Sequence, residues 1–226
     1  MDFEVRAGEV VALIGDNGAG KTTLVRVLAG DLRPTEGAIV LGERAVRFDG
    51  RSDARAHGIE VVYQDLAMAP HLEPAENFFL GRERTRWGAP GRWLGVLDRP
   101  AMRAETQRAL QDLGVTLRDG ARRVADLSGG QRQGLAVARA AHWASKLMFL
   151  DEPTAALGAA QRKSVLDIVR RLRDRGLGIV YISHDIPEVL TIADRIHVLR
   201  RGETAAVLRA ADADVAMLMR AMAGAV

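Results

Sequence analysis

Four short and largely apolar runs, rich in β-branched side chains, are spread along the chain. They are Val10 to Ile14, Ile59 to Tyr63, Leu147 to Leu150 and Ile179 to Ile182. Such runs are typical of strands buried on both faces of a parallel sheet. Between the last two runs, Val165, Ile168, Val169 and Leu172 recur at helical spacing and predict a helix that ends at Gly176. Strands and helices that alternate in this way predict an α/β fold.

Two other stretches alternate between apolar and polar residues, which is the pattern of antiparallel strands. They are Phe3-Glu4-Val5 and the segment from Ala38 to Phe48, where Gly42 marks a turn. Residues 65–144 instead hold helical pieces, with a surface loop predicted from Trp87 to Pro100 because Gly, Pro and Arg are frequent there. We therefore predict one domain over 1–226, in which an α/β core with an antiparallel β subdomain (1–64 and 145–226) carries an inserted helical lobe (65–144).

Composition narrows the class of protein. The chain has 226 residues, of which 48% are apolar, as in ordinary globular domains. It has no cysteine and no uninterrupted run of about 18 apolar residues, which excludes disulfides, thiolate metal sites and an apolar membrane-spanning helix. The early acids Asp2 and Glu4 do not suit a secretory signal. A net charge of only +3 favours a solvated surface over nucleic-acid binding.

Each of the four apolar runs is followed directly by residues that suit ligand binding or catalysis. These residues are Gly15, Gln64, the pair Asp151-Glu152 and the pair Ser183-His184. In open α/β sheets, ligands bind beyond the carboxyl ends of the strands. The four runs are therefore predicted to bring these groups to one edge of the sheet.

The loop after the first run is rich in glycine and ends in a lysine and two threonines. It reads Gly15-Asp16-Asn17-Gly18-Ala19-Gly20-Lys21-Thr22-Thr23, and a helix is predicted from Thr23 to Ala29. This arrangement fits the phosphate-binding pattern G-x-x-x-x-G-K-[ST], with Lys21 at the β- and γ-phosphates and the Thr22 hydroxyl at Mg²⁺. The alternative is a glycine-rich turn with a solvated lysine. A chance match in a chain of this length is on the order of one in a hundred.

Two neighbouring acids, Asp151 and Glu152, end the third apolar run. A carboxylate there can hold Mg²⁺, and its neighbour can polarise an attacking water. The alternative is a pair of acids that caps the following helix. The nearby phosphate loop favours the first interpretation.

The segment Ser128-Gly129-Gly130-Gln131 has two compatible interpretations. Serine with glutamine three residues later is a capping box that opens a helix. A plain cap does not need two glycines, which cost about 1 kcal/mol each in a helix. Two bare backbone N–H groups at a helix start suit a phosphate that approaches closely, so we also predict a phosphate clamp.

His184 and Gln64 are weaker signals by themselves. A single histidine is most often a surface or core residue, but its place at the predicted reactive edge lets His184 donate to a γ-phosphate. Gln64 can contact Mg²⁺ or the attacking water, and it lies where the predicted core meets the predicted lobe. A hinge there would link the nucleotide state to the position of the lobe.

In order and spacing, these motifs resemble the nucleotide-binding subunits of ATP-binding cassette (ABC) transporters over nearly the whole chain. Gly15 to Thr22 matches that family's Walker A loop, Gln64 its Q-loop, and Leu127 to Gln131 its signature. Leu147 to Glu152 matches its Walker B strand with the catalytic glutamate, and His184 its switch histidine. The resemblance implies a P-loop NTPase core that binds and hydrolyses ATP with Mg²⁺.

The resemblance also implies roles for residues. Glu152, His184 and Gln64 would be catalytic, and Thr22, Gln64 and Asp151 would hold Mg²⁺. ATP would lie between the loop from Gly15 to Thr23 of one chain and Ser128 to Gln131 of a second chain.

Partners follow from the same resemblance. The second chain would be another copy or a paralogous ATPase subunit. Membrane permease subunits would hold the pair at the cytoplasmic face of the plasma membrane, and a periplasmic solute-binding protein would act indirectly. The sequences of the phosphate loop and of Asp151 to Gly158 are similar to those of bacterial fructose-type and ribose-type monosaccharide importers.

Two features depart from the family, and two other functions stay open. The family has a further N-terminal strand with an aromatic residue that stacks on adenine, and its absence before Met1 predicts weak ATP binding. An aspartate usually stands where this chain has Gly158, although sugar-type members resemble this chain there.

The alternative functions are a soluble ABC ATPase that acts on DNA or ribosomes, and a nucleotide-binding module that does not hydrolyse ATP. Against the first, the chain has neither an internal coiled coil nor a second cassette.

Overall fold

The structure is a computed structural model, and it describes residues 1–87, 91, 93–118 and 120–224. The chain divides into two compact units. Unit 1 comprises Met1–Gln64, Trp143–Ala155 and Val169–Val226, and unit 2 comprises Asp65–His142 and Ala156–Ile168.

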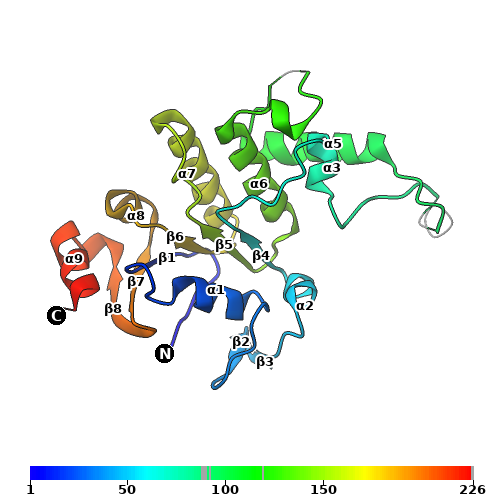
Figure 1. Ribbon diagram of the computed structural model, residues 1–226. Coiled ribbons are helices and arrows are strands. Elements are labelled where there is room, and N and C mark those ends of the chain that lie inside the picture. Colours follow the sequence, from blue (N-terminus) through cyan, green and yellow to red (C-terminus); the bar gives the residue numbers. More distant parts are fainter. Residues whose placement is uncertain (88–90, 92, 119, 225–226) are drawn as a thin grey trace. The chain divides into compact units, whose positions relative to one another are not determined.

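Unit 1 is built on a six-stranded sheet with the strand order β4-β5-β6-β1-β7-β8 (Figure 1). The strands are β1 (Val10–Ile14), β4 (Ile59–Val62), β5 (Leu147–Asp151), β6 (Gly178–Ile182), β7 (Arg195–Arg200) and β8 (Glu203–Arg209). Neighbouring strands from β4 to β7 are parallel, and β8 is antiparallel to β7. The four strands predicted from apolar runs are thus confirmed, and they are neighbours in the sheet.

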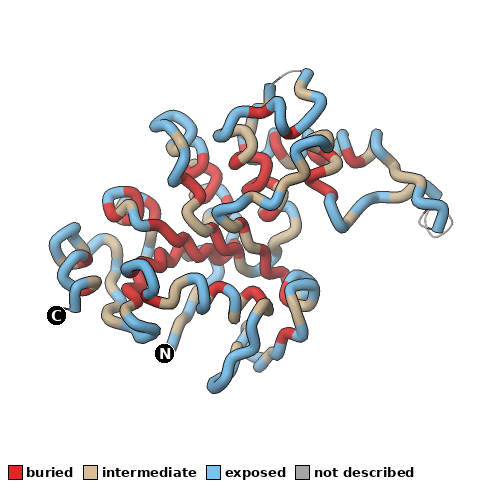
Figure 2. Tube along the Cα trace, viewed as in Figure 1, coloured by how far each residue is buried: buried red, intermediate tan, exposed pale blue. Residues whose placement is uncertain are grey.

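Side chains of β1 enter two separate apolar clusters, one on each face of the sheet. Leu13 belongs to a cluster with residues of α1 (Lys21–Leu28) and α2 (Arg51–Ala56). Ala12 and Ile14 belong to a cluster with residues of α8 (Ile186–Ile192) and α9 (Val215–Ala223). Because both faces of β1 are covered, all five of its residues are buried, as Figure 2 shows for the central strands in red.

The antiparallel hairpin predicted around Gly42 is also present in unit 1. It consists of β2 (Ile39–Leu41) and β3 (Arg44–Val46), which pair with Ile39 opposite Val46. A short 3₁₀ turn, η2 (Ala210–Asp212), precedes α9.

Unit 2 is helical. Its elements are α3 (Pro74–Phe78), α5 (Arg99–Leu113), η1 (Val124–Asp126), α6 (Gly129–Trp143) and the first part of α7 (Ala159–Asp174). The start of α5 follows from its sequence, since the Asp98 side chain accepts from the Ala101 N–H at 3.3 Å. Gly114 ends this helix in the left-handed conformation, with φ of 70°. The apolar stripe predicted for α7 is buried in the structure.

Two predicted elements need correction. Residues 3–5 are not a strand, because no strand among the described residues pairs with them; Phe3 instead packs edge-on against His197, with ring centroids 5.1 Å apart. The predicted surface loop from 87 to 100 lies partly outside the described residues, at 88–90 and 92. Its last two residues, Arg99 and Pro100, begin α5, since proline is well tolerated in the first turn of a helix.

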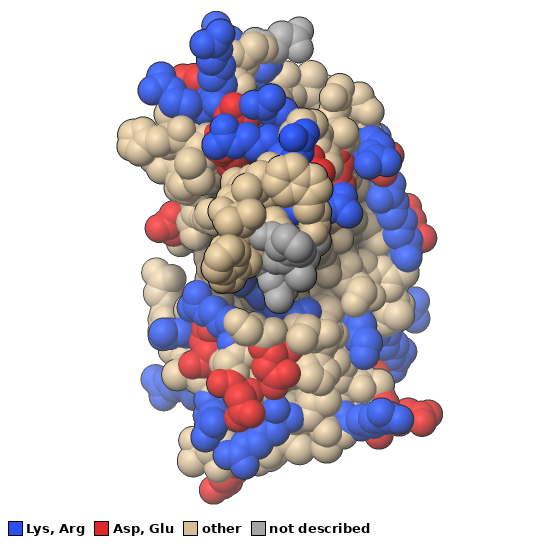
Figure 3. All heavy atoms as spheres, turned by 90° about the vertical axis from the view of Figure 1, so that its right-hand side faces the viewer, with Lys and Arg blue, Asp and Glu red and all other residues tan. Residues whose placement is uncertain are grey.

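Surface charges lie beside charges of the opposite sign on the face drawn in Figure 3. In unit 2, for example, Arg103 pairs with Glu73 through two contacts of 2.8 and 2.9 Å, and Arg84 pairs with Glu105. Within the part of the chain that the structure describes, no helix is both long enough and apolar enough to cross a membrane.

Candidate functional site

The carboxyl ends of four neighbouring strands in unit 1 carry the polar residues singled out above. Along the sheet these are Gln64 after β4, Asp151 and Glu152 at the end of β5, His184 after β6 and Gly15 after β1. All four strands are parallel, so their carboxyl ends share one edge of the sheet. The predicted convergence is therefore confirmed for the strand ends.

The glycine-rich loop begins at Gly15, and its first residue has to be glycine. Gly15 has a φ of 154°, and a Cβ there would overlap the carbonyl oxygen of Leu199 in β7. The backbone of β7 thus packs directly against the start of the loop. Further along, Ala19 accepts a backbone bond at 2.8 Å from Gly202, in the turn between β7 and β8. Two contacts from one hairpin fix the loop at both ends.

Helix α1 starts at Lys21, two residues earlier than predicted, and its N-terminus is left open for an anion. Gly20 offers no side-chain cap, and the first turn contains no acid. Two other helices of unit 1 differ, because Asp185 of α8 and Asp214 of α9 each accept a backbone N–H with their carboxylate. Helix α2 also lacks a side-chain cap, at Gly50, but its first turn contains Asp53. Uncapped N–H groups at a helix start carry partial positive charge, which suits a phosphate.

Backbone carbonyl groups of the glycine-rich loop hold the Lys21 side chain in place. Its ammonium donates to the carbonyl oxygens of Gly15 at 2.6 Å and Asp16 at 3.1 Å. This arrangement places one full positive charge beside the open start of α1. The loop therefore combines a cation with uncapped N–H groups, as binding of a polyphosphate requires.

Glu152 and His184 are in direct contact. The Glu152 Oε1 and the His184 Nδ1 are 2.8 Å apart; the histidine is mostly exposed and the glutamate mostly buried. The Glu152 N–H also donates to the carbonyl oxygen of Ile182 at 2.9 Å. The backbone of Glu152 is left-handed, with φ of 51°, at a cost of about 1–2 kcal/mol for a residue with a Cβ. Strain of this kind is often found at functional sites.

Asp151 lies in an environment that disfavours its charge. Burial raises the pKa of its carboxyl above the ordinary value, the neighbouring Glu152 raises it further, and Lys21 partly offsets the rise. A divalent cation beside the carboxyl would relieve both effects. The donor set, carboxylate and hydroxyl oxygen, suits Mg²⁺. Among the described residues no three His, Cys, Asp or Glu side chains form a metal cage, so bound phosphate would have to supply further ligands.

Gln64 is exposed, but the residue before it is firmly held. The Tyr63 hydroxyl donates to Asp31 at 2.9 Å, and Arg51 pairs with the same carboxylate while lying 5.3 Å from the centre of the Tyr63 ring. Burial and the bond to Asp31 raise the pKa of Tyr63 to about 12, so the hydroxyl stays a donor. The boundary between the two units falls directly after Gln64. The predicted hinge role of this residue stays a prediction.

Ser128 and Gln131 form the predicted capping box at the start of α6 in unit 2. The Ser128 Oγ accepts from the Gln131 N–H at 3.3 Å, and the Gln131 Oε1 accepts from the Ser128 N–H at 3.0 Å. The cap is thus confirmed. The phosphate clamp predicted for the same residues stays a prediction.

One buried polar cluster escaped the sequence analysis. The Glu188 Oε1 accepts from the Thr154 hydroxyl and from the Tyr181 hydroxyl, both at 2.6 Å, and all three side chains are buried. Thr154 comes two residues after Glu152, and Glu188 comes four residues after His184. The cluster therefore ties together the two segments that carry the contacting acid and histidine.

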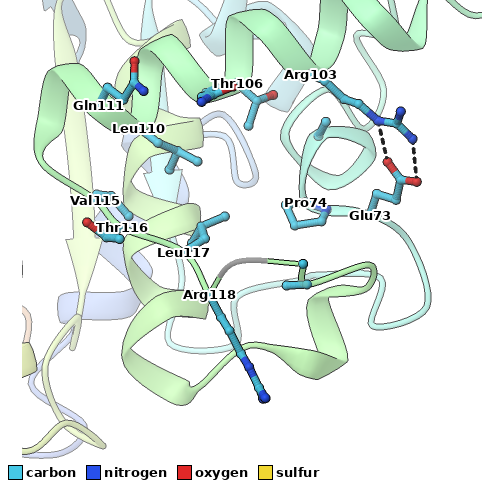
Figure 4. A pocket seen from close by; sticks show the side chains of 14 residues that line it. Glu73, Pro74, Arg103, Thr106, Leu110, Gln111, Val115, Thr116, Leu117 and Arg118 are labelled. Atoms are coloured by element: carbon cyan, nitrogen blue, oxygen red, sulfur yellow. Dashed lines mark hydrogen bonds and ion pairs between the residues drawn. The ribbon is translucent and has the colours of Figure 1, made fainter.

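Unit 2 also contains a cavity of about 510 Å³ between α3, α5 and residues 115–118 and 120–121 (Figure 4). The Glu73–Arg103 ion pair closes one of its sides, and Leu110, Val115 and Leu117 line it. None of the residues predicted to bind nucleotide is among the described residues that line it.

The fold and the glycine-rich loop between a central parallel strand and a helix define a P-loop NTPase of the α/β class. More specifically, the chain belongs to the ABC transporter family, whose profile, described as ABC transporter, matches residues 1–155.

Curated relatives match over 90–99% of this chain. It is 45% identical to the fructose import ATP-binding protein FrcA of Rhizobium meliloti, covering 99% of this chain and 86% of that protein. It is 42% identical to the xylose/arabinose import ATP-binding protein XylG of Sulfolobus acidocaldarius, covering 90% of this chain and 78% of the relative. It is 41% identical to the ribose import ATP-binding protein RbsA 3 of Rhizobium meliloti, covering 99% of this chain but 42% of the relative.

Solved structures agree on the fold. A nucleotide-free ATP-binding cassette from an ABC transporter superposes with a TM-score of 0.79 at 23% identity, over 92% of this chain and 83% of that one. A dimeric cassette in a post-hydrolysis state with ADP and phosphate superposes with a TM-score of 0.75 at 24% identity, over 92% and 88% of the two chains.

Proposed function

We propose that this chain is the ATP-hydrolysing subunit of an importer for a small solute, a monosaccharide, that passes through a separate membrane permease. The observation that carries the ATPase part is the contact between Glu152 and His184 at the edge of the sheet that also bears the phosphate loop. The similarity to fructose, xylose and ribose import proteins supports the solute class. Residues 1–226 then act as one ABC ATPase domain, with 65–144 as its helical lobe.

The roles of the residues follow from their chemistry. Lys21 and the open start of α1 bind the β- and γ-phosphates. The Glu152 carboxylate accepts a proton from the attacking water. The Nδ1 of His184 lies 2.8 Å from that carboxylate, and its other ring nitrogen, Nε2, would donate a hydrogen bond to the γ-phosphate. Water then attacks phosphorus, the bond to the ADP oxygen breaks, and phosphate leaves.

Mg²⁺ bound beside the nucleotide would neutralise charge on its phosphate oxygens. Asp151, whose burial and acidic neighbour favour a nearby cation, would hold it together with the Thr22 hydroxyl and Gln64. These residues supply few oxygens, in keeping with a cation that is bound mainly through phosphates and water.

The site is shared between two chains in this proposal. Ser128 to Gln131 of a second copy, or of a paralogous subunit, would contact the γ-phosphate through the start of α6. The permease would hold both subunits at the cytoplasmic face of the membrane. A periplasmic binding protein would deliver the solute to the permease.

A mixing experiment tests the shared site. Lys21→Ala removes the phosphate-binding cation, and Ser128→Arg blocks the clamp, so each variant alone is expected to be inactive. Equal mixtures should recover up to about a quarter of the wild-type ATPase rate, because half of the dimers are mixed and each of these has one complete site. A mixture of Lys21→Ala with Glu152→Gln is the matched control, since both changes damage the same half and no complete site forms. Full activity of Ser128→Arg by itself would contradict the proposal.

Uptake of labelled sugars tests the solute class. A host strain that produces Lys21→Ala in place of the wild-type chain should lose uptake of fructose, ribose or xylose, because its importer cannot hold ATP. The other two sugars and an unrelated amino acid serve as controls in the same cells. If uptake of all three sugars is unchanged, the monosaccharide assignment is wrong, although the ATPase assignment would stand.

A further inference from the structure

The two glycines at the start of α6 have different surroundings. A Cβ on Gly129 would meet no heavy atom of the described residues within 4 Å. A Cβ on Gly130 would lie 2.5 Å from the Gln161 Cγ and 3.0 Å from the Gln161 Cβ. The contact with the Cγ is the severe one, whereas the contact with the Cβ requires its neighbours to yield by only a few tenths of an ångström. The side chain of Gln161, in the same unit, therefore leaves little room for any side chain at position 130.

Gln161 also contacts the turn that begins α7. A Cβ on Gly158 would lie 2.8 Å from the Gln161 Oε1, and the Gly158 carbonyl oxygen accepts the first helical bond of α7, from Arg162 at 2.9 Å. One side chain thus touches the starts of two helices, at Gly130 in α6 and at Gly158 before α7. Both helix starts carry partial positive charge; the amide oxygen of Gln161 faces Gly158, and its side-chain carbons face Gly130.

We propose that Gln161 is a positioning residue that sets the backbone of Gly130 for the γ-phosphate and links it to the turn at Gly158. The proposal rests on the proposed function, because it assumes that the start of α6 binds the phosphate of a partner chain. Gly129 leaves open space for the phosphate, while Gly130 packs on Gln161 and fixes the direction of the N–H groups. A cavity of about 710 Å³ lined by Ser128, Gly130 and Gln161, among others, adjoins this contact.

A double-mutant experiment tests the link. Gly130→Ala should clash with Gln161, lower the thermal unfolding midpoint and reduce the ATPase rate about 10- to 100-fold, since small displacements of a positioning group cost that much. Gln161→Ala removes the Cγ and leaves room for the new methyl group. The double variant Gly130→Ala/Gln161→Ala should therefore recover both the midpoint and at least part of the ATPase rate relative to Gly130→Ala.

The matched control lies on the same helix. A Cβ on Gly134 would be 2.9 Å from the Val115 Cγ1 and does not involve Gln161, so Gln161→Ala should not rescue Gly134→Ala. Gln161→Glu is a second variant of nearly the same shape. It is expected to fold, because a negative charge suits two helix starts, but to weaken ATP-driven dimerisation by repelling the phosphate.

The outcomes separate this inference from the proposed function. If the double variant is no better than Gly130→Ala in midpoint or rate, the contact with Gln161 is irrelevant and the inference is wrong. If only the midpoint recovers, the γ-phosphate itself requires glycine at 130, and the positioning role in catalysis is overturned. If the wild-type chain hydrolyses no ATP, the proposed function fails, while the unfolding midpoints still decide whether Gln161 and Gly130 are coupled.

Discussion

Replacement of Glu152 by glutamine is expected to lower the ATPase rate at least ~100-fold while ATP binding persists, since general-base catalysis contributes about that much. The amide keeps the shape of the side chain and a hydrogen bond to His184, but it cannot accept the proton of the attacking water. Because ATP is then not consumed, the variant should accumulate as an ATP-bound dimer. Phosphate release and size-exclusion chromatography with and without ATP measure the two effects.

The control for this change is Glu43→Gln, at an exposed residue in the turn of the β2–β3 hairpin. It makes the same chemical change far along the chain from the strand ends that carry the site, and the rate should stay at the wild-type value. Wild-type turnover by Glu152→Gln would remove this residue from the mechanism. Loss of ATP binding in the variant would instead show that the carboxylate is needed to build the site.

The second large effect is expected from the buried cluster around Glu188. Tyr181→Phe and Thr154→Val each remove one hydroxyl that donates to the Glu188 carboxylate at 2.6 Å. Hydrogen bonds to charged groups are worth about 1.5–3 kcal/mol, so each change should lower the free energy of unfolding by that amount. For a chain of this size, this corresponds to a fall of about 2–4 °C in melting temperature per kcal/mol.

The two changes should not be additive, because both hydroxyls solvate the same carboxylate. Each single variant should also slow ATP hydrolysis, since the cluster ties the segment of Glu152 to the segment of His184. Thr191→Val is the control. The exposed Thr191 hydroxyl donates to the backbone carbonyl oxygen of Pro187 in α8, and its loss should change stability by less than about 0.5 kcal/mol. If Tyr181→Phe and Thr154→Val have small and additive effects on the free energy of unfolding, the two hydroxyls do not share a buried carboxylate.

Strands that are buried on both faces and the short hairpin around Gly42 could be read from the sequence, whereas β7 and β8 could not. β7 contains Arg195, His197 and Arg200, which break its apolar run. In the structure, His197 is buried and its Nε2 lies 2.9 Å from the Thr204 hydroxyl of β8; burial lowers the pKa of the ring. Such a strand becomes recognisable only once its neighbour is known.

Some parts of the candidate site could likewise be predicted from the sequence, and others could not. The phosphate loop could be predicted because its residues are contiguous and its chemistry sets their spacing. The cluster of Thr154, Tyr181 and Glu188 could not, since its members are distant in sequence and each is common in any helix or strand. The phosphate predicted at Gly130 stays a prediction, and the contact of Gly130 with the side chain of Gln161 could not be read from the sequence.

The position of β1 in the middle of the sheet has a consequence for synthesis on the ribosome. β1 ends at Ile14, yet its two hydrogen-bonded neighbours, β6 and β7, end at Ile182 and Arg200. At about 5–20 residues per second, translation takes on the order of 10–40 s to bridge that interval. During this time the earliest strand of the sheet emerges without its partners, with an apolar face exposed. Chaperones that bind nascent chains should therefore be found on the first segment of this protein, and the nascent chain should become able to retain ATP only after β7 has left the exit tunnel.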